Sequence, residues 1–150
     1  MQSVVFELDA IIEQHVPSLL ALSKDKLTYK PSPTKWSKQE ILGHMVDSAQ
    51  NNIRRFIVAQ HEELPLIVYN QDKWVDAVNY QQYDSKDLVQ LWRLLNKHMI
   101  AVLKNLTPAL AERQCQTGGP HTIEWLAEDY VKHLRHHLHQ VLDLEPVAYP

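Results

Sequence analysis

Histidines gathered in one stretch are the residues of this sequence whose type and spacing are best suited to chemistry. Residues 129–140 read DYVKHLRHHLHQ and carry four of the nine histidines within seven positions. The stretch lacks Gly and Pro, so we expect a helix on which His133 and His137 lie one turn apart on the same face. Two imidazoles at that spacing are able to bind one metal ion.

The face that holds His133 and His137 is otherwise apolar. It continues through Tyr130 and further apolar side chains, so the two histidines occupy positions where a core stripe normally carries leucines. We expect His136 and His139 to point away and to be solvated. The alternative interpretation is a polar surface helix whose histidines bind nothing, and this stretch alone leaves both interpretations open.

A metal site at His133 and His137 requires at least one more ligand. Zinc takes three protein ligands and a water in catalytic sites, and four protein ligands in structural sites. His44 is the best candidate, because it lies near the start of a predicted core helix. The competing histidines are His15, His61, His98 and His121, of which His98 is the best placed.

The helix that carries His44 has the clearest start signal in the sequence. Ser37 and Glu40 form a capping box, and a hydrophobic staple of Trp36 and Ile41 flanks it. A row of polar side chains then borders the apolar stripe of this helix. The row consists of His44, Ser48, Asn51 and Asn52. We expect it to line a pocket beside the metal, and solvent exposure is the alternative.

A long connection over residues 61–83 follows this helix and has no sustained helical pattern. Loops of this length in compact domains are often binding segments, and its aromatic residues indicate that it packs against the core. We expect Asp72 and Trp74 of this connection, together with Tyr130, to complete the pocket, and a short helix near residues 73–79. The alternative is a connection that only covers one end of the core.

The remaining elements predict an all-α fold. The expected helices cover residues 3–23, 37–60, 84–106 and 122–144. An extended connection is expected over residues 24–35 and a loop over residues 109–120. Ser3 is a candidate cap for the first helix, and Pro17 is expected to kink or split it. Four amphipathic helices without a strand pattern, with a long connection between the second and the third, predict a four-helix bundle.

Composition limits the classes of function. A chain of 150 residues with 45% hydrophobic and 22% charged residues is expected to form a single domain over residues 1–150. A net charge of -3 without a long Lys/Arg run gives no electrostatic footprint for nucleic acid or an anionic membrane. With Cys115 as the single cysteine, no signal-peptide pattern and no membrane-spanning stretch, we expect a cytoplasmic protein.

Taken together, the motifs resemble the DinB-like superfamily of bacterial metal-binding four-helix bundles. The resemblance is carried by WSxxEILGH at residues 36–44, DSAQNN at residues 47–52 and DYVxHLxHH at residues 129–137. It implies a three-histidine metal site made of His44, His133 and His137. It also implies a small-molecule or thiol substrate, and possible homodimers, which are common in the family.

The resemblance implies a metal-dependent enzyme, either a hydrolase or a small-thiol S-transferase. Imidazole ligands without a thiolate pair favour Zn²⁺ or Ni²⁺, and three neutral imidazoles leave a coordination position for a water or a thiolate. No Glu stands beside the histidines as in HExxH, so a protease-like reaction is disfavoured, and Asp47, Glu128 and Asp129 are nearby carboxylates. The alternative function is a non-catalytic metal- or ligand-binding bundle.

Overall fold

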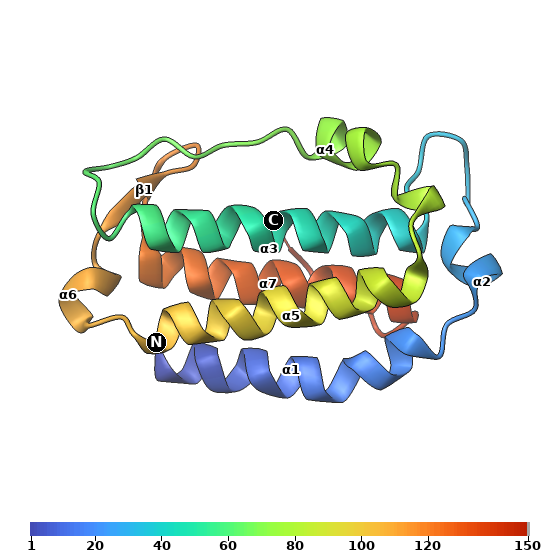
Figure 1. Ribbon diagram of the computed structural model, residues 1–150, viewed down its shortest axis with the longest axis horizontal. Coiled ribbons are helices and arrows are strands. Elements are labelled where there is room, and N and C mark those ends of the chain that lie inside the picture. Colours follow the sequence, from blue (N-terminus) through green and yellow to red (C-terminus); the bar gives the residue numbers. More distant parts are fainter. Residues whose placement is uncertain (150) are drawn as a thin grey trace.

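The structure, a computed structural model, describes residues 1–149. Within this range, four long helices pack as a bundle (Figure 1), and they are α1 (Gln2–Leu20), α3 (Lys38–Val58), α5 (Ser85–Lys104) and α7 (Ile123–Leu142). Around the bundle the helices follow the order α1, α5, α3, α7, so that each packs against two neighbours. The prediction of an all-α four-helix bundle is confirmed.

The connection between α3 and α5 gives the bundle its topology. Residues 59–84 return along the length of α3, so α5 starts at the same end of the bundle as α3 and runs parallel to it, whereas α7 is antiparallel to α3 (Figure 1). The connection contains α4 (Gln71–Val78) and the 3₁₀ helix η1 (Tyr80–Gln82). It therefore covers a face of α3 that a simple up-and-down bundle would leave open.

Local capping signals account for the helix starts. The Ser37 hydroxyl accepts the Glu40 amide, and the Glu40 carboxylate accepts the Ser37 amide at 2.7 Å, which confirms the capping box. Asp84 and Thr122 likewise cap α5 and α7. The prediction of a Ser3 cap is wrong, because α1 already begins at Gln2.

Two other predictions differ from the structure. Pro17 does not split α1, which continues to Leu20. The expected extended connection contains a short helix, α2 (Lys24–Thr28), and the expected loop contains α6 (Pro108–Ala111), β1 (Gln114–Gln116) and β2 (Pro120–Thr122). The strands pair as an antiparallel hairpin, and Leu66 of the long connection bridges to its outer edge at Gln116.

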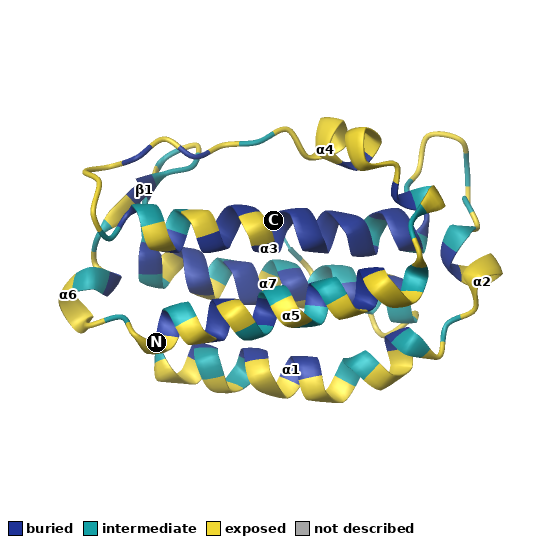
Figure 2. Ribbon diagram, in the orientation of Figure 1, coloured by how far each residue is buried: buried dark blue, intermediate teal, exposed yellow. Residues whose placement is uncertain are grey.

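Burial is distributed unevenly among the helices. The ribbon of α3 is buried over most of its length, whereas α1 and α5 alternate between buried and exposed positions (Figure 2). Of the 21 residues of α3, 14 are buried, and they include polar residues such as His44, Asp47 and Asn51. The apolar core is built from all four long helices, with Trp92 and Phe56 as its largest fully buried side chains.

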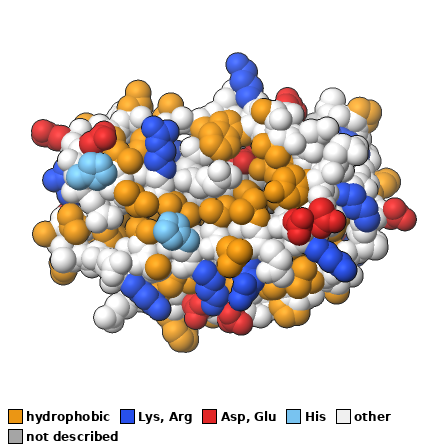
Figure 3. Space-filling model, in the orientation of Figure 1, with side chains coloured by type: hydrophobic (Ala, Val, Ile, Leu, Met, Phe, Trp, Pro, Cys, Tyr) orange, Lys and Arg blue, Asp and Glu red, His pale blue; other side chains and the backbone are white. Residues whose placement is uncertain are grey.

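The surface shown in Figure 3 carries Lys and Arg side chains beside Asp and Glu side chains. Some of these charges pair across helices, as when Lys97 of α5 binds Asp9 and Glu13 of α1 at 2.7 and 2.8 Å. Both acids are exposed, so such pairs contribute little to stability. In the part of the chain that the structure describes, no helix has the length and apolar character needed to cross a membrane.

Tyr80 packs directly on the backbone of α3, and this contact yields the first prediction. A Cβ added at Gly43 would lie 2.1 Å from the Tyr80 ring, so Gly43→Ala must displace this buried ring. We expect the steric cost, about 1–3 kcal/mol, to exceed the gain of about 1 kcal/mol in helix propensity, and urea denaturation should show a net loss of stability. Gly119→Ala, whose Cβ would meet its nearest neighbour at 3.5 Å, is the control, and equal stability of both variants would contradict the prediction.

Candidate metal centre

Three histidines from α3 and α7 converge on one point. The Nε2 atom of His133 lies 3.0 Å from Nε2 of His44 and 3.0 Å from Nε2 of His137. All three possible ligand atoms lie within 4.8 Å of one another. Because α3 and α7 are antiparallel, His44 near the start of α3 meets the second half of α7.

These distances fit a divalent ion. Zn–N bonds of about 2.0–2.1 Å in a tetrahedral site place ligand nitrogens about 3.3 Å apart. Two of the three nitrogen pairs are already within a few tenths of an ångström of that separation, so small side-chain rotations suffice. Among residues 1–149, no fourth His, Cys, Asp or Glu joins the group. The site therefore offers three nitrogen ligands and leaves at least one coordination position open.

Burial keeps the three rings neutral. Burial, together with the neighbouring histidines, lowers the pKa of His44 to about 4 and that of His133 to about 2. Burial also lowers the pKa of His137. A neutral imidazole has a free lone pair, which is the form that binds metal ions.

The second ring nitrogens differ in their surroundings. Nδ1 of His137 lies 2.8 Å from Oε1 of Gln140, and Nδ1 of His133 lies 3.5 Å from the Ser48 hydroxyl. Nδ1 of His44 is buried and has no hydrogen-bond partner within residues 1–149. The Trp36 ring packs on His44 with 5.1 Å between ring centroids. Two of the three rings are thus oriented by a polar partner and the third by an aromatic contact.

The polar row predicted on α3 is buried next to the histidines. Ser48 contacts His133, and the Asn52 amide donates to the Ser48 carbonyl at 2.9 Å. The Asn51 amide donates to the Asp47 carbonyl at 2.9 Å. Solvent exposure, the alternative for this row, is therefore wrong, since the three predicted side chains are at most 6% exposed.

The other three predicted pocket residues lie in different places. Asp72 lines the groove described below. Trp74 is 36% exposed and packs edge-on against Tyr69. Tyr130 is 2% exposed, and its hydroxyl donates to Asn96 of α5 at 2.7 Å, so it belongs to the core and its assignment to the pocket is corrected.

A groove of about 600 Å³ opens beside the histidines. Its lining combines apolar and polar side chains, and includes Trp36, Ile41, Asp72, His137 and Gln140. Grooves of this volume match the size range of small-ligand sites. His137 contributes to both the groove and the histidine cluster, so a small molecule in the groove would contact one of the three rings.

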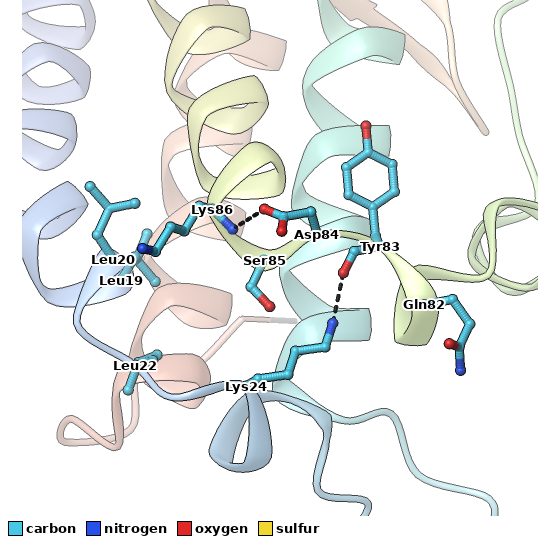
Figure 4. A pocket seen from close by; sticks show the side chains of 9 residues that line it. All are labelled: Leu19, Leu20, Leu22, Lys24, Gln82, Tyr83, Asp84, Ser85 and Lys86. Atoms are coloured by element: carbon cyan, nitrogen blue, oxygen red, sulfur yellow. Dashed lines mark hydrogen bonds between the residues drawn. The ribbon is translucent and has the colours of Figure 1, made fainter.

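Another cavity, of about 570 Å³, lies between the end of α1 and the start of α5 (Figure 4). Lys24 crosses it, and its ammonium donates to the Tyr83 carbonyl at 2.7 Å. The start of α5 is already capped by Asp84. None of the three clustered histidines lines this cavity, whereas His137 lines the groove.

The remaining histidines stay outside the cluster. His98, the strongest competitor as third ligand, is exposed on α5, and His121 stacks on Trp125. His136 and His139 were expected to be solvated, but their Nδ1 atoms donate to carbonyls of the segment after α7, at Val147 and Glu145.

The segment after α7, residues 143–149, folds back on that helix, and the sequence analysis missed it. The Tyr149 hydroxyl donates to Asp129 at 2.9 Å, and the Tyr149 ring meets the His133 ring with 5.2 Å between centroids. No periodicity marks residues 143–149, so the sequence contains no signal for this contact.

Asp47, another candidate carboxylate, accepts the Tyr80 hydroxyl at 2.5 Å, and burial raises its pKa to about 6.

Curated proteins with similar sequences carry names that mention metal. "Putative metal-dependent hydrolase BH0277" of Halalkalibacterium halodurans is 27% identical over 122 residues, which cover 79% of this chain and 71% of that protein. "Putative metal-dependent hydrolase YfiT" of Bacillus subtilis is 26% identical over 117 residues, 73% of this chain. The match covers 64% of YfiT, so this chain spans just under two thirds of that relative.

A comparison with solved structures and a match to a family model agree with these sequence relatives. The solved structure of YfiT, described as having an unusual four-helix bundle topology, superposes with a TM-score of 0.86 over 95% of this chain and 83% of that one, at 20% identity. At this identity the likeness shows the fold alone. The DinB superfamily model matches residues 8–141, nearly the whole sequence. The chain therefore belongs to the DinB superfamily.

Proposed function

We propose that this protein is a metal-dependent hydrolase that acts on a small molecule bound in the groove beside His137. The observation that carries the proposal is the convergence of three imidazole nitrogens with an accessible groove on one side. The names of the curated relatives support the same reaction class.

In this proposal His44, His133 and His137 hold one Zn²⁺ or Ni²⁺. Imidazole suits both ions, and Cys115, the only thiol in the sequence, is buried with its sulfur 3.2 Å from the Pro65 carbonyl, so it is not available as a ligand. A bound ion supplies a Lewis acid that lowers the pKa of a coordinated water and polarises a substrate carbonyl or phosphoryl group.

The protein's own side chains would position the substrate. Trp36 and Ile41 form an apolar wall of the groove, which excludes water from one side of the bound molecule. Asp72 supplies a carboxylate on this lining, and Gln140 supplies the amide N–H that is not bonded to His136, so a polar substrate finds a hydrogen-bond acceptor and a donor. Asp72 has no ion-pair partner within residues 1–149, so it is free to bind a ligand.

The competing function is a non-catalytic metal-binding bundle. Such a site is closed by a fourth protein ligand. Within residues 1–149 the cluster has three candidate ligands and a groove beside it, and this arrangement favours the enzyme.

The first test of this proposal concerns metal content. We expect about one Zn²⁺ or Ni²⁺ per purified chain, and His133→Ala or His137→Ala should lower metal affinity by more than the ~10–100-fold that loss of an outer-shell partner costs. His139→Ala and His98→Ala are matched controls, because their rings lie outside the cluster. Elemental analysis and chelator competition measure the effect, and equal loss in all four variants would indicate weak surface binding instead.

Chelation should leave the fold intact. The core contains apolar residues from all four long helices, so folding does not depend on an ion as it does in a zinc finger. We expect the far-UV circular dichroism spectrum to stay helical after metal removal. A coil-like spectrum in chelator would make the site structural and would favour the non-catalytic function.

The third ligand and the open coordination position are tested together. His44→Ala should weaken metal binding, and 2-mercaptoethanol or azide should change the visible spectrum of the cobalt-substituted wild type. A response to the thiol alone would favour the S-transferase reaction over hydrolysis. If His44→Ala keeps full affinity, or if no added ligand changes the spectrum, the proposed site is wrong in its third ligand or in its open position.

A further inference from the structure

A relay of hydrogen bonds links the segment after α7 to the metal-site residue His137. Nδ1 of His136 lies 2.6 Å from the Val147 carbonyl, and Nε2 of the same ring lies 3.1 Å from Nε2 of Gln140. The other end of the Gln140 amide, Oε1, lies 2.8 Å from Nδ1 of His137. Residues 136, 137 and 140 share one side of α7, since 136 and 140 are one turn apart.

The direction of every proton in this relay follows from its first member. A carbonyl only accepts, so Nδ1 of His136 carries the hydrogen and, in a neutral ring, Nε2 is the acceptor. The Gln140 amide must then donate its N–H to His136 and present its oxygen to His137. That oxygen also only accepts, so His137 carries its hydrogen on Nδ1.

This outcome leaves the lone pair of His137 on Nε2, the nitrogen that lies 3.0 Å from Nε2 of His133. A neutral imidazole binds a metal only through the nitrogen that lacks a hydrogen. The opposite tautomer would point an N–H into the cluster. Reversing the Gln140 amide would produce that tautomer. The amide oxygen would then face the lone pair on Nε2 of His136, and this repulsion is avoided only if His136 gives up its bond to the Val147 carbonyl.

We propose that Gln140 and His136 are positioning residues that hold His137 in the tautomer that ligates metal through Nε2, and that the Val147 carbonyl sets the direction of the relay. This inference rests on the proposed three-histidine metal site. Partners of the non-ligating nitrogen fix ring orientation and tautomer and raise the basicity of the ligand. The segment after α7 thereby acts on the metal site through two side chains without being a ligand.

Residues 143–149 are held against α7 independently of His136. His139 donates to the Glu145 carbonyl, and the Tyr149 hydroxyl donates to Asp129. The Val147 carbonyl lies between these two anchors in sequence, so its position does not depend on His136 alone. His139 is therefore a matched control, because it anchors the same segment but has no bond to Gln140 or His137.

The test measures zinc affinity of the full-length protein by chelator competition in four variants. Gln140→Leu removes the acceptor for His137 and should weaken zinc binding about tenfold, the lower end of the range for outer-shell partners, because Gln140 is exposed to solvent. Gln140→Glu keeps an acceptor oxygen and should stay near the wild type. His136→Ala should weaken binding, whereas His139→Ala should not.

A second readout separates positioning from simple structural support. In zinc-free protein, long-range ¹H–¹⁵N correlation spectra of the histidine rings report which nitrogen of His137 carries the hydrogen. We expect the Nδ1–H form in the wild type and Gln140→Glu, and a mixture of tautomers in Gln140→Leu and His136→Ala. A purely structural role would lower stability in these variants without changing the tautomer.

The outcomes are distinguishable. If Gln140→Leu and His136→Ala bind zinc like the wild type and keep the Nδ1–H form of His137, the relay proposal is overturned while the metal site stands. If the wild type binds no zinc, or if His133→Ala binds it equally well, the metal site and the relay fail together. Equal weakening in His136→Ala and His139→Ala would assign the effect to anchoring of residues 143–149 and would overturn the relay.

Discussion

Burial of the polar face of α3 is the constraint on which the rest of this structure depends. A buried polar group without a hydrogen bond costs about 1–3 kcal/mol, so hydrogen-bond partners are needed along this face. Among its buried side-chain atoms within residues 1–149, Nδ1 of His44 and Oδ2 of Asp47 lack one. The long connection supplies several of them. The Gln39 amide donates to the Tyr83 carbonyl at 3.0 Å, Asp47 accepts the Tyr80 hydroxyl, and Arg55 donates to the Ile67 carbonyl at 3.1 Å. The connection that returns along α3 reaches all of these groups, and it brings the start of α5 to the same end of the bundle as the start of α3, so the two helices run parallel.

The sequence predicts those parts of the fold that depend on local signals. The capping box at Ser37 marks a helix start by interactions within four residues, and this prediction is confirmed. The caps at Asp84 and Thr122 are equally local. The hairpin of β1 and β2 was not predicted from the sequence. Strands of three residues are too short to show a periodicity, and Leu66, which bridges to β1, lies about fifty residues away in the chain. Such pairing is decided by tertiary packing.

The same distinction between local signals and tertiary contacts applies to the candidate metal site. The spacing of His133 and His137 predicts a shared face, because helix geometry alone determines it. Tyr130 shows the limit of this argument. It lies two turns before His137 on the same side of α7, but there its hydroxyl reaches across the core to Asn96 of α5, so the face is groove at one end and core at the other. Helical periodicity gives the direction of a side chain and says nothing about which neighbour it meets along the axis.

Four histidines within seven residues raise the question of how a helix selects two of them for one site. Residues 143–149 contribute to the answer, since His136 and His139 each donate Nδ1–H to a carbonyl of this segment and so have fixed orientations away from the cluster. His133 instead directs Nε2 toward Nε2 of His44, His137 directs Nε2 toward Nε2 of His133, and burial keeps these rings neutral. Hydrogen bonding to the backbone thus sorts chemically identical side chains into two groups. The apolar core stabilises the bundle, so the orientations of these histidines are not needed for folding and can be determined by the site.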